Sequence, residues 1–278
     1  MEIWKAVILG IVEGITEFLP VSSTGHLTIT EKIVGLQVDS KAVTAYTALI
    51  QVGAIAAAII YFWKDIVRIL VALWRGVRSA EDRQTADWRL AAAVTVGSAP
   101  VVVVALAAKS LIEGPLRSLW YVAGALIVWS VVMVFAERAA TQRRGERDIT
   151  IKDGLIIGLV QCFSLVPGVS RSGATISAGL LRDLDRVTST RMAFFLGIPA
   201  LTAAGIYEAI SYQDEIATEV GWGAAIVGVL VSFVVAYASI AWLLKFVRGN
   251  SMLTFVWYRL TAGAILILAL SVGWISAT

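Results

Sequence analysis

Long apolar runs alternate with short charged connectors along most of this chain. Six such runs lie at 43–63, 90–108, 119–136, 192–210, 222–244 and 254–276. Each is close to the ~20 residues that a helix needs to cross a ~30 Å hydrocarbon core. The alternating pattern of a membrane β-barrel is absent, so helices are the remaining way to satisfy the backbone in lipid. The pattern predicts an all-α polytopic membrane protein with six transmembrane helices.

Two shorter stretches, 1–35 and 151–185, are each interrupted by proline and glycine. The first is broken at Pro20 to Gly25 and the second at Pro167 to Gly173. None of the arms is both long enough and apolar enough to cross the membrane. Short, broken segments at corresponding positions of two halves indicate discontinuous elements with a site at their tips. We therefore expect two re-entrant helical hairpins in addition to the six spans.

The two broken stretches resemble each other in sequence. GIVEGITEFLPVSSTGH, which begins at Gly10, aligns without a gap on GLVQCFSLVPGVSRSGA, which begins at Gly158. The same register places 44–56 on 192–204. Chance matching between apolar segments is the alternative, but polar positions match as well. The alignment predicts an internal duplication within one membrane domain, 1–278, with repeat one at about 1–136 and repeat two at about 151–278.

The distribution of charge predicts how the chain crosses the membrane. The connectors 64–89 and 138–152 are rich in arginine and are cytoplasmic by the positive-inside rule. A re-entrant 151–185 returns the arginines that follow it to the cytoplasm, whereas a single span would place them outside. The first hairpin then enters from outside and the second from the cytoplasm. The repeat is therefore expected to be inverted, with its two loops meeting near the bilayer midplane.

Composition supports the membrane assignment and excludes other classes. Hydrophobic residues make up 58% of the chain and charged residues 15%, and the mean hydropathy is +0.81, far above that of soluble domains. The single cysteine, Cys162, excludes an intramolecular disulfide and a cysteine metal cluster. A net charge of +3 with scattered basic residues implies no nucleic-acid partner. A homo-oligomer is compatible with the sequence.

Glu13 and Glu17 are a carboxylate pair within the first apolar segment. On a helix, residues four apart share one face, with Cβ atoms ~5–6 Å apart. Two carboxylates held so closely in a low dielectric need a proton or a cation. Hard divalent cations such as Mg²⁺ or Ca²⁺ take oxygen ligands of this kind, so we expect Glu13 and Glu17 to hold a metal. The alternative is an interfacial pair that faces a water-filled vestibule.

His26 is the only histidine and follows the hydroxyl-rich run Ser22, Ser23 and Thr24. It fits a general base, a nucleophile towards phosphorus, or a proton donor to a leaving group. A lone histidine on an apolar face is more often a hydrogen-bonded core residue. The adjacent hydroxyls and carboxylates favour the functional interpretation here.

Arg171 lies between Ser170 and Ser172 in an otherwise apolar region. A buried guanidinium without an acid in its own segment needs an anion, and its fork of donors suits phosphate oxygens. Gly168 and Gly173 allow the backbone to approach and point N–H groups at the same anion. An ion pair of Arg171 with Glu13 or Glu17 across the repeat interface is the alternative.

The duplication does not preserve the chemistry of its two loops. In the alignment, Glu17 corresponds to Leu165, Ser23 to Arg171, and His26 to Ala174. We therefore predict one composite site rather than two equivalent ones. The first half supplies the acid, the metal ligand and the nucleophile, and the second half binds phosphate.

These motifs resemble those of the undecaprenyl-diphosphate phosphatase family, the bacitracin-resistance type of integral membrane phosphatase. Glu13 to Glu17 matches its E/Q-x-x-x-E element, which FLPVSSTGH follows, and PGVSRSGAT, from Pro167 to Thr175, matches its P-G-x-S-R-S-x-x-T element. The likeness covers nearly the whole chain. It implies hydrolysis of undecaprenyl diphosphate to the carrier lipid undecaprenyl phosphate, with a divalent cation, at the outer face of the bacterial inner membrane.

The resemblance also implies roles for individual residues. Glu13 and Glu17 hold the metal on the diphosphate, and Arg171, Ser170 and Thr175 bind its oxygens. The nucleophile is Ser23 activated by His26, His26 itself, or a metal-bound water, and we favour the first two. A secondary transporter or lipid flippase with an inverted repeat is the competing class, and phosphate release without a gradient distinguishes the two.

Overall fold

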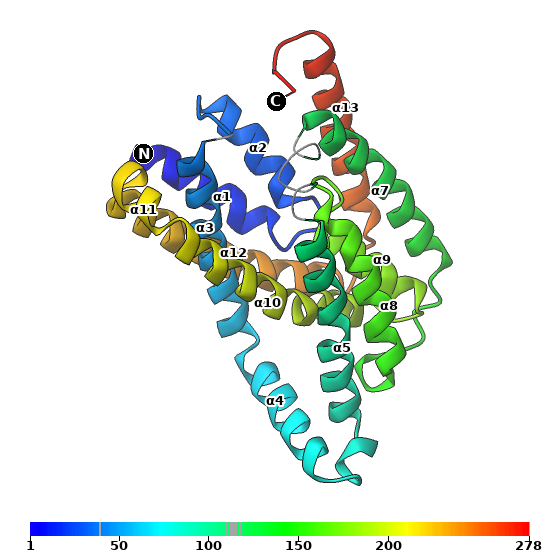
Figure 1. The fold of residues 1–278 in the computed structure, drawn as a ribbon. Helices are drawn as coiled ribbons and strands as arrows, with labels where there is room; N and C mark the ends of the chain where they lie inside the picture. The colour runs from blue at the N-terminus through cyan, green and yellow to red at the C-terminus, as the bar shows by residue number, and fades with distance from the viewer. Residues whose placement is uncertain (39, 109–110, 112–115, 117, 278) are drawn as a thin grey trace.

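The described part of the chain is built from helices (Figure 1). This computed structural model describes residues 1–278 except 39, 109–110, 112–115, 117 and 278. Within these residues the only β-type pairing is an isolated bridge between Arg144 and Leu184. The predicted all-α class is confirmed.

Among the described residues, six helices are long and apolar enough to cross a membrane. They are α3 (Lys41–Tyr61), α5 (Ala86–Ala107), α7 (Leu119–Ala139), α10 (Arg186–Ser211), α12 (Trp222–Phe246) and α13 (Leu253–Ser271). Each coincides with one of the six predicted runs. The last helix ends five residues before the predicted boundary, and α10 begins six residues earlier than predicted because Asp185 caps it by accepting from the Thr188 amide at 2.7 Å. The chain is a multi-pass membrane protein.

Two pairs of shorter helices coincide with the broken stretches. They are α1 (Ile3–Thr16) with α2 (Ser23–Ile33), and α8 (Ile151–Gln161) with α9 (Arg171–Leu181). At 1.5 Å per residue each helix is roughly 16–21 Å long, too short to span a ~30 Å core. The second pair returns to the end of the molecule where it started, since Arg182 donates to Asp153 at 2.8 Å. In the first pair, Met1 and Leu36 pack against the same hydrophobic cluster.

One expected connector contains a helix. The charge pattern predicts a cytoplasmic loop over 64–89, but the structure has α4 (Trp63–Arg78) and a 3₁₀ turn (Asp82–Gln84) there. Apolar side chains recur at helical spacing between the arginines, at Trp63, Val67, Leu70, Trp74 and Val77. The arginines between these residues make the amphipathic pattern hard to recognise in the sequence. Helix α4 follows α3 directly after a break at Phe62.

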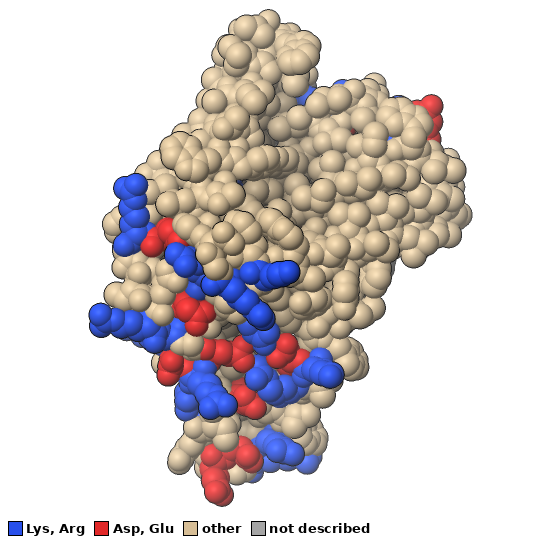
Figure 2. All heavy atoms as spheres, turned by 180° about the vertical axis from the view of Figure 1, so that it is seen from behind, with Lys and Arg blue, Asp and Glu red and all other residues tan. Residues whose placement is uncertain are grey.

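Ion pairs join the basic connectors at one end of the molecule. Arg68 contacts Glu146 at 2.6 Å, and Arg191 contacts Glu146 at 2.7 Å and Asp65 at 2.8 Å. Burial alone raises the pKa of Glu146, but the hydrogen bond from Arg68 and the charge of Arg191 outweigh it and lower the pKa. Figure 2 shows these charges gathered over one end, while most of the remaining surface on that face carries none.

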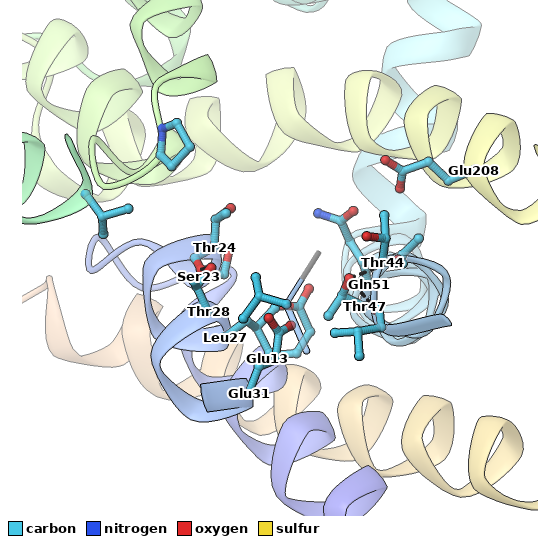
Figure 3. Close-up of a pocket in the computed structure, with 15 residues that line it drawn as sticks. Glu13, Ser23, Thr24, Leu27, Thr28, Glu31, Thr44, Thr47, Gln51 and Glu208 are labelled. Carbon is cyan, nitrogen blue, oxygen red and sulfur yellow. Dashed lines mark hydrogen bonds between the residues drawn. The ribbon is translucent and has the colours of Figure 1, made fainter. Parts of the chain in front are cut away.

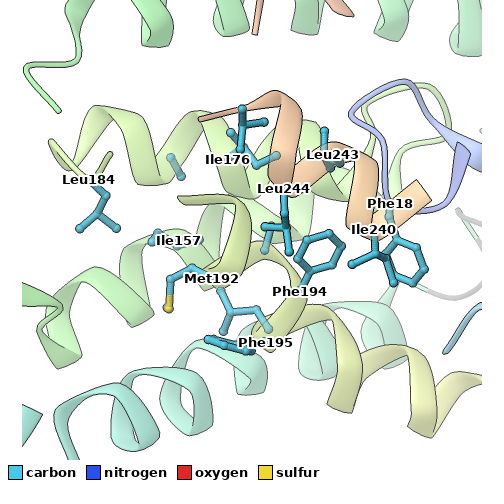
Figure 4. Packing of buried hydrophobic residues seen from close by; sticks show 14 of the residues in the cluster. Phe18, Ile157, Ile176, Leu184, Met192, Phe194, Phe195, Ile240, Leu243 and Leu244 are labelled. Atoms are coloured by element: carbon cyan, nitrogen blue, oxygen red, sulfur yellow. The ribbon is translucent and has the colours of Figure 1, made fainter. Parts of the chain in front are cut away.

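The largest hydrophobic cluster links the first short pair to the second half of the chain. Phe18, in the loop after α1, packs against Phe194 of α10 with ring centroids 5.4 Å apart. Ile176 of α9 and Leu243 of α12 belong to the same cluster (Figure 4). This packing holds the loop between α1 and α2 against helices that come from the other end of the sequence.

Glycines let each short pair approach a long helix of the opposite half. A Cβ atom on Gly14 of α1 would lie 2.8 Å from the Ser232 carbonyl of α12, and one on Gly158 of α8 would overlap the Gly97 carbonyl of α5. Such close backbone contact is typical of small residues at helix interfaces in membranes. The pairings α1 with α12 and α8 with α5 therefore have the same design in both halves.

Candidate active site

The loops of the two short pairs meet. The Gly168 amide, in the loop between α8 and α9, donates to Ser22 Oγ at 3.1 Å. Ser172 Oγ, in the first turn of α9, donates to the Leu19 carbonyl at 2.9 Å. The structure thus brings together the two sequence motifs, as the composite-site hypothesis requires.

Both loops end in the same backbone conformation. Ser22 and Ser170 have positive φ angles, 78° and 75°, and immediately precede α2 and α9. Their hydroxyls accept from the amides of Gly25 at 3.5 Å and Gly173 at 3.2 Å. Positive φ is uncommon for a residue other than glycine and is often found at functional sites. Helices α2 and α9 therefore both begin at the shared site, and the N-terminus of each helix favours negative charge there.

Glu17 connects the two motifs. One oxygen, Oε2, accepts from Ser23 Oγ at 2.6 Å, and the other, Oε1, accepts from Arg171 Nη2 at 3.3 Å. The Glu17 side chain is buried. The anticipated alternative, an ion pair across the interface, is therefore present, and it includes a serine hydroxyl.

Arg171 keeps donors that no described residue uses. Its Nε and Nη1 are buried and have no hydrogen-bond partner within the described part of the chain. The guanidinium packs against Gly197 of α10, where a Cβ atom would overlap it. A buried cation with unused N–H groups is costly unless an anion fills the position. The ion pair with Glu17 uses Nη2 and thus leaves Nε and Nη1 for the predicted phosphate contacts.

Glu13 faces a polar cleft. It is 1% exposed, and its Oε1 has no hydrogen-bond partner among the described residues. The cleft has a volume of about 200 Å³ and is also lined by Ser23, Thr24, Glu31 and Gln51. Figure 3 shows the side chains of α1 and α2 on one side of it and those of α3 on the other. Glu17 and Arg171 lie behind Ser23, one or two hydrogen bonds from the cleft wall.

The donor set fits a cation that completes its shell with substrate. The described residues contain no group of three or more His, Cys, Asp or Glu arranged to hold a metal ion. Mg²⁺ is often bound through one or two carboxylates together with substrate phosphates. Glu13 offers an unpartnered oxygen, whereas both oxygens of Glu17 already have partners. Glu13 is therefore the better ligand of the two predicted.

His26 lies on the other side of α2. Its Nδ1 donates to the Ser22 carbonyl at 2.7 Å, because a carbonyl oxygen can only accept. Nε2 then accepts from the Tyr258 hydroxyl at 2.6 Å, and the two rings stack. The structure does not place His26 against Ser23, whose hydroxyl binds Glu17 instead.

The remaining predicted residues shape the two loops. Gly168 has a φ of 99°, and a Cβ atom there would overlap the Val122 carbonyl. Ser170 and Ser172 hydroxyls are 3.1 Å apart, and Thr175 Oγ1 donates to the Arg171 carbonyl at 2.8 Å. Thr24 is exposed on the cleft wall. Apart from Thr24, these side chains bind neighbouring backbone or each other.

Sequence reasoning missed Arg259 of α13. Its guanidinium is fully buried and donates to the Pro20 carbonyl at 3.2 Å and the Gly168 carbonyl at 2.9 Å, one in each loop. It also donates to Ser130 Oγ of α7 at 3.2 Å. The signal was available, because a lone arginine inside a transmembrane run marks a functional position by default. Arg259 holds the two loops together.

Comparisons with known proteins identify the family of this chain. A family model described as bacitracin resistance protein BacA matches residues 6–265. Undecaprenyl-diphosphatase 3 of Frankia casuarinae is 54% identical over 278 residues, which is all of both chains. The undecaprenyl-diphosphatase of Cutibacterium acnes is 55% identical and covers 94% of this chain and 95% of its own. That of Micrococcus luteus is 42% identical over 98% of this chain and 99% of its own.

Proposed function

We propose a function for this chain from the premise that it belongs to the bacitracin resistance protein BacA family. It is an integral membrane hydrolase that converts undecaprenyl diphosphate to undecaprenyl phosphate and inorganic phosphate. This reaction recycles the carrier lipid for cell-wall synthesis. The names of its relatives favour a diphosphatase over a secondary transporter or lipid flippase.

One observation carries the chemical proposal. The chain Ser23–Glu17–Arg171 joins a hydroxyl, a carboxylate and a guanidinium from the two motifs, and no described residue accepts from two nitrogens of that guanidinium. A nucleophile, a base and an anion-binding group are the parts that phosphoryl transfer needs from a protein. The N-termini of α2 and α9 add favourable positive potential at the same place.

Ser23 is the nucleophile in this proposal. Its oxygen attacks the terminal phosphorus while its proton passes to Glu17 Oε2, 2.6 Å away. The bond between that phosphorus and the bridging oxygen breaks, which releases undecaprenyl phosphate and leaves a phosphoserine. Water then attacks the phosphoserine, the bond between phosphorus and the Ser23 oxygen breaks, Glu17 returns its proton to that oxygen, and inorganic phosphate leaves. The contacts of His26 favour Ser23 over His26 as nucleophile, because both ring nitrogens already have partners.

The second loop binds the phosphoryl oxygens. Arg171 presents Nε and Nη1, and its charge offsets the negative charge that develops on the transferred group. The Ser170 hydroxyl and the Thr175 side chain support the first turn of α9 from within. They position Arg171 rather than contact the substrate through their hydroxyl protons.

A divalent cation, Mg²⁺ or Ca²⁺, is the expected cofactor. Glu13 would hold it from the cleft side, whereas the two oxygens of Glu17 stay with Ser23 and Arg171. Bound there, it would neutralise charge on the diphosphate oxygens. The buried Glu13 oxygen, which has no partner within the described part of the chain, supports this assignment.

We also infer that the two short pairs are re-entrant hairpins of an inverted repeat. Supporting this are the matching loop conformations, the short helices and the equivalent glycine contacts in both halves. The cleft lies beside the start of α3 and the last turns of α10, which the charge pattern places outside. The site would then open to the outer face of the bacterial inner membrane.

Phosphate release tests the proposal. Protein purified in detergent should release inorganic phosphate from undecaprenyl diphosphate without any gradient, and Arg171→Ala should abolish this activity. The same protein with Arg248→Ala, an exposed connector arginine, is the control and should retain it. Substrate transport in vesicles without phosphate release would overturn the proposal.

A further inference from the structure

A groove runs along the face of α2 that points away from the cleft. It has a volume of about 790 Å³ and lies between α2 and α13. His26, Ile29 and Ile33 line it from α2, whereas Ser23, Thr24 and Glu31 line the cleft. Helix α2 therefore separates a polar chamber from a second, larger space.

Most of the groove wall is hydrocarbon. Ile29 packs with Leu266 and Leu270 in a cluster between α7 and α13, which forms the back of the groove. Ala262 and Ile265 continue the wall along α13. An apolar wall inside a membrane protein suits a lipid chain and offers little to a charged headgroup.

Polar groups at the two ends of the groove are already bonded to each other. At one end His26 Nε2 and the Tyr258 hydroxyl are 2.6 Å apart. At the other end Lys32 Nζ donates to the Ser276 carbonyl at 2.7 Å and to its hydroxyl at 3.1 Å. The lining spans His26 to Ile33 on α2 and Tyr258 to Ala269 on α13, roughly 10 and 16 Å at 1.5 Å per residue. This shape fits an extended chain better than a compact ligand.

The inner end of the groove adjoins the proposed nucleophile. His26 is three residues, or roughly 4.5 Å of helix rise, from Ser23, and its Nδ1 donates to the Ser22 carbonyl. A ligand with phosphate at Ser23 could therefore pass over the start of α2 and place its hydrocarbon in the groove. The first turn of α2 lies between the groove and the cleft, whose linings share no residue.

We propose that this groove binds the first isoprene units of the substrate's prenyl chain, an inference that rests on the proposed function. The bilayer is as apolar as the groove, so the gain is not transfer from water but orientation of the lipid. Fixing the chain next to α2 holds the terminal phosphorus at Ser23 and removes unproductive orientations. The diphosphate and the prenyl chain would thus occupy opposite faces of α2.

Filling the groove tests this proposal. Ala262→Phe places a ring in the groove, and Ala264→Phe adds the same ring two residues away at an exposed position outside its lining. The readout is kcat/KM for undecaprenyl diphosphate divided by kcat/KM for dimethylallyl diphosphate, which has a single isoprene unit. Ala262→Phe should lower this ratio by about tenfold or more, and Ala264→Phe should leave it at the wild-type value.

A second variant tests the same proposal in case Ala262→Phe does not fold. Ile265→Ser removes groove hydrocarbon at a residue that is 60% exposed and not part of a core cluster, and it should also lower the ratio. An unchanged ratio in the folded variants overturns the groove proposal. A wild-type protein that releases phosphate from neither substrate would instead overturn the proposed function, so the two failures are distinguishable.

Discussion

Glu13 and Glu17 are one helical turn apart, yet the fold gives them different surroundings. Glu17 accepts from Ser23 and Arg171, while Glu13 has an oxygen at the cleft to which no described residue donates. A carboxylate that already binds the hydroxyl of a nucleophile is suited to take its proton, and one with a free oxygen is suited to a cation. The two acids therefore have separate tasks in this account.

Glu13→Gln should weaken cation binding more than it affects folding. The amide keeps one oxygen ligand but loses the charge, so the Mg²⁺ concentration for half-maximal phosphate release should rise by at least about tenfold. Glu17→Ala should instead abolish turnover at every Mg²⁺ concentration. A Mg²⁺ titration of the two purified variants checks both, and an unshifted midpoint in Glu13→Gln would remove Glu13 from the cation site.

Arg259→Met should lower kcat and the melting temperature together. It leaves the buried carbonyls of Pro20 and Gly168 without their donor, at about 1–3 kcal/mol for each unsatisfied group. Arg259→Lys should recover part of both properties, since one ammonium reaches fewer acceptors. Arg248→Met, at an exposed connector position, is the matched control. Wild-type kcat in folded Arg259→Met would show that the two loops hold their positions without it.

At this scale the sequence predicted which residues meet at the candidate site better than it predicted their individual partners. The motifs identified Glu17, Ser23 and Arg171, and the structure joins them by hydrogen bonds. The partner of His26 could not be inferred, because Tyr258 is 232 residues away in the chain. The position of Arg259 inside an apolar run marks it as functional, but its role could not be inferred, because its acceptors are mainly backbone carbonyls that no side-chain motif records.

At the scale of the elements, the positions of the short helices depend on close backbone contacts with long helices. The backbones of α8 and α5 touch at Gly158 and Gly97. Gly124 of α7 offers a comparison, because a Cβ atom there has no neighbour within 4 Å. Helix propensity alone favours alanine over glycine by about 1 kcal/mol at both positions.

Gly158→Ala should therefore destabilise the protein, whereas Gly124→Ala should not. Forcing a methyl group into the α8–α5 contact should cost about 1–3 kcal/mol, as overpacking does in cores. Thermal unfolding of the two variants in the same detergent measures the difference. Equal melting temperatures would mean that α8 can move away from α5 without loss.

The hydrophobic pattern predicted the spans well because each is a continuous apolar run. It missed α4 because arginines alternate with apolar residues there at helical spacing. The short helices were recognised from proline and glycine, which interrupt the backbone pattern. Their packing partners, α12 and α5, could not be inferred since glycine contacts depend on the tertiary fold.

The molecule as a whole has a charged end and an end with few basic residues. At the charged end, Arg68 of α4 and Arg191 of α10 both pair with Glu146, which lies between α7 and α8. Arg144, in the same connector, pairs with Asp153 of α8. The N-terminal ammonium donates to the Glu219 and Val220 carbonyls near the opposite ends of α10 and α12. This separation agrees with a chain whose basic end is cytoplasmic.

Thiol labelling of intact cells should reveal that orientation. In a Cys162→Ala background, Ser40→Cys and Thr218→Cys should react with an impermeant reagent added outside. Ser79→Cys and Thr141→Cys, at the charged end, should react only after the cells are opened. Labelling of Ser79→Cys in intact cells would show that the chain has the opposite orientation and that the cleft lies on the cytoplasmic side.

The central claim is that a serine of the first loop performs the chemistry while the second loop binds phosphate. Its most direct test is the kcat of purified Ser23→Ala, His26→Ala and Ser172→Ala on undecaprenyl diphosphate at saturating Mg²⁺. Ser23→Ala should lose at least about a thousandfold in kcat, as removal of a nucleophile does. Ser172→Ala, which loses hydrogen bonds to Leu19 and Ser170, should lose about tenfold to a hundredfold in kcat/KM. Ser23→Ala with a kcat within tenfold of wild type, beside an inactive His26→Ala, would contradict the account.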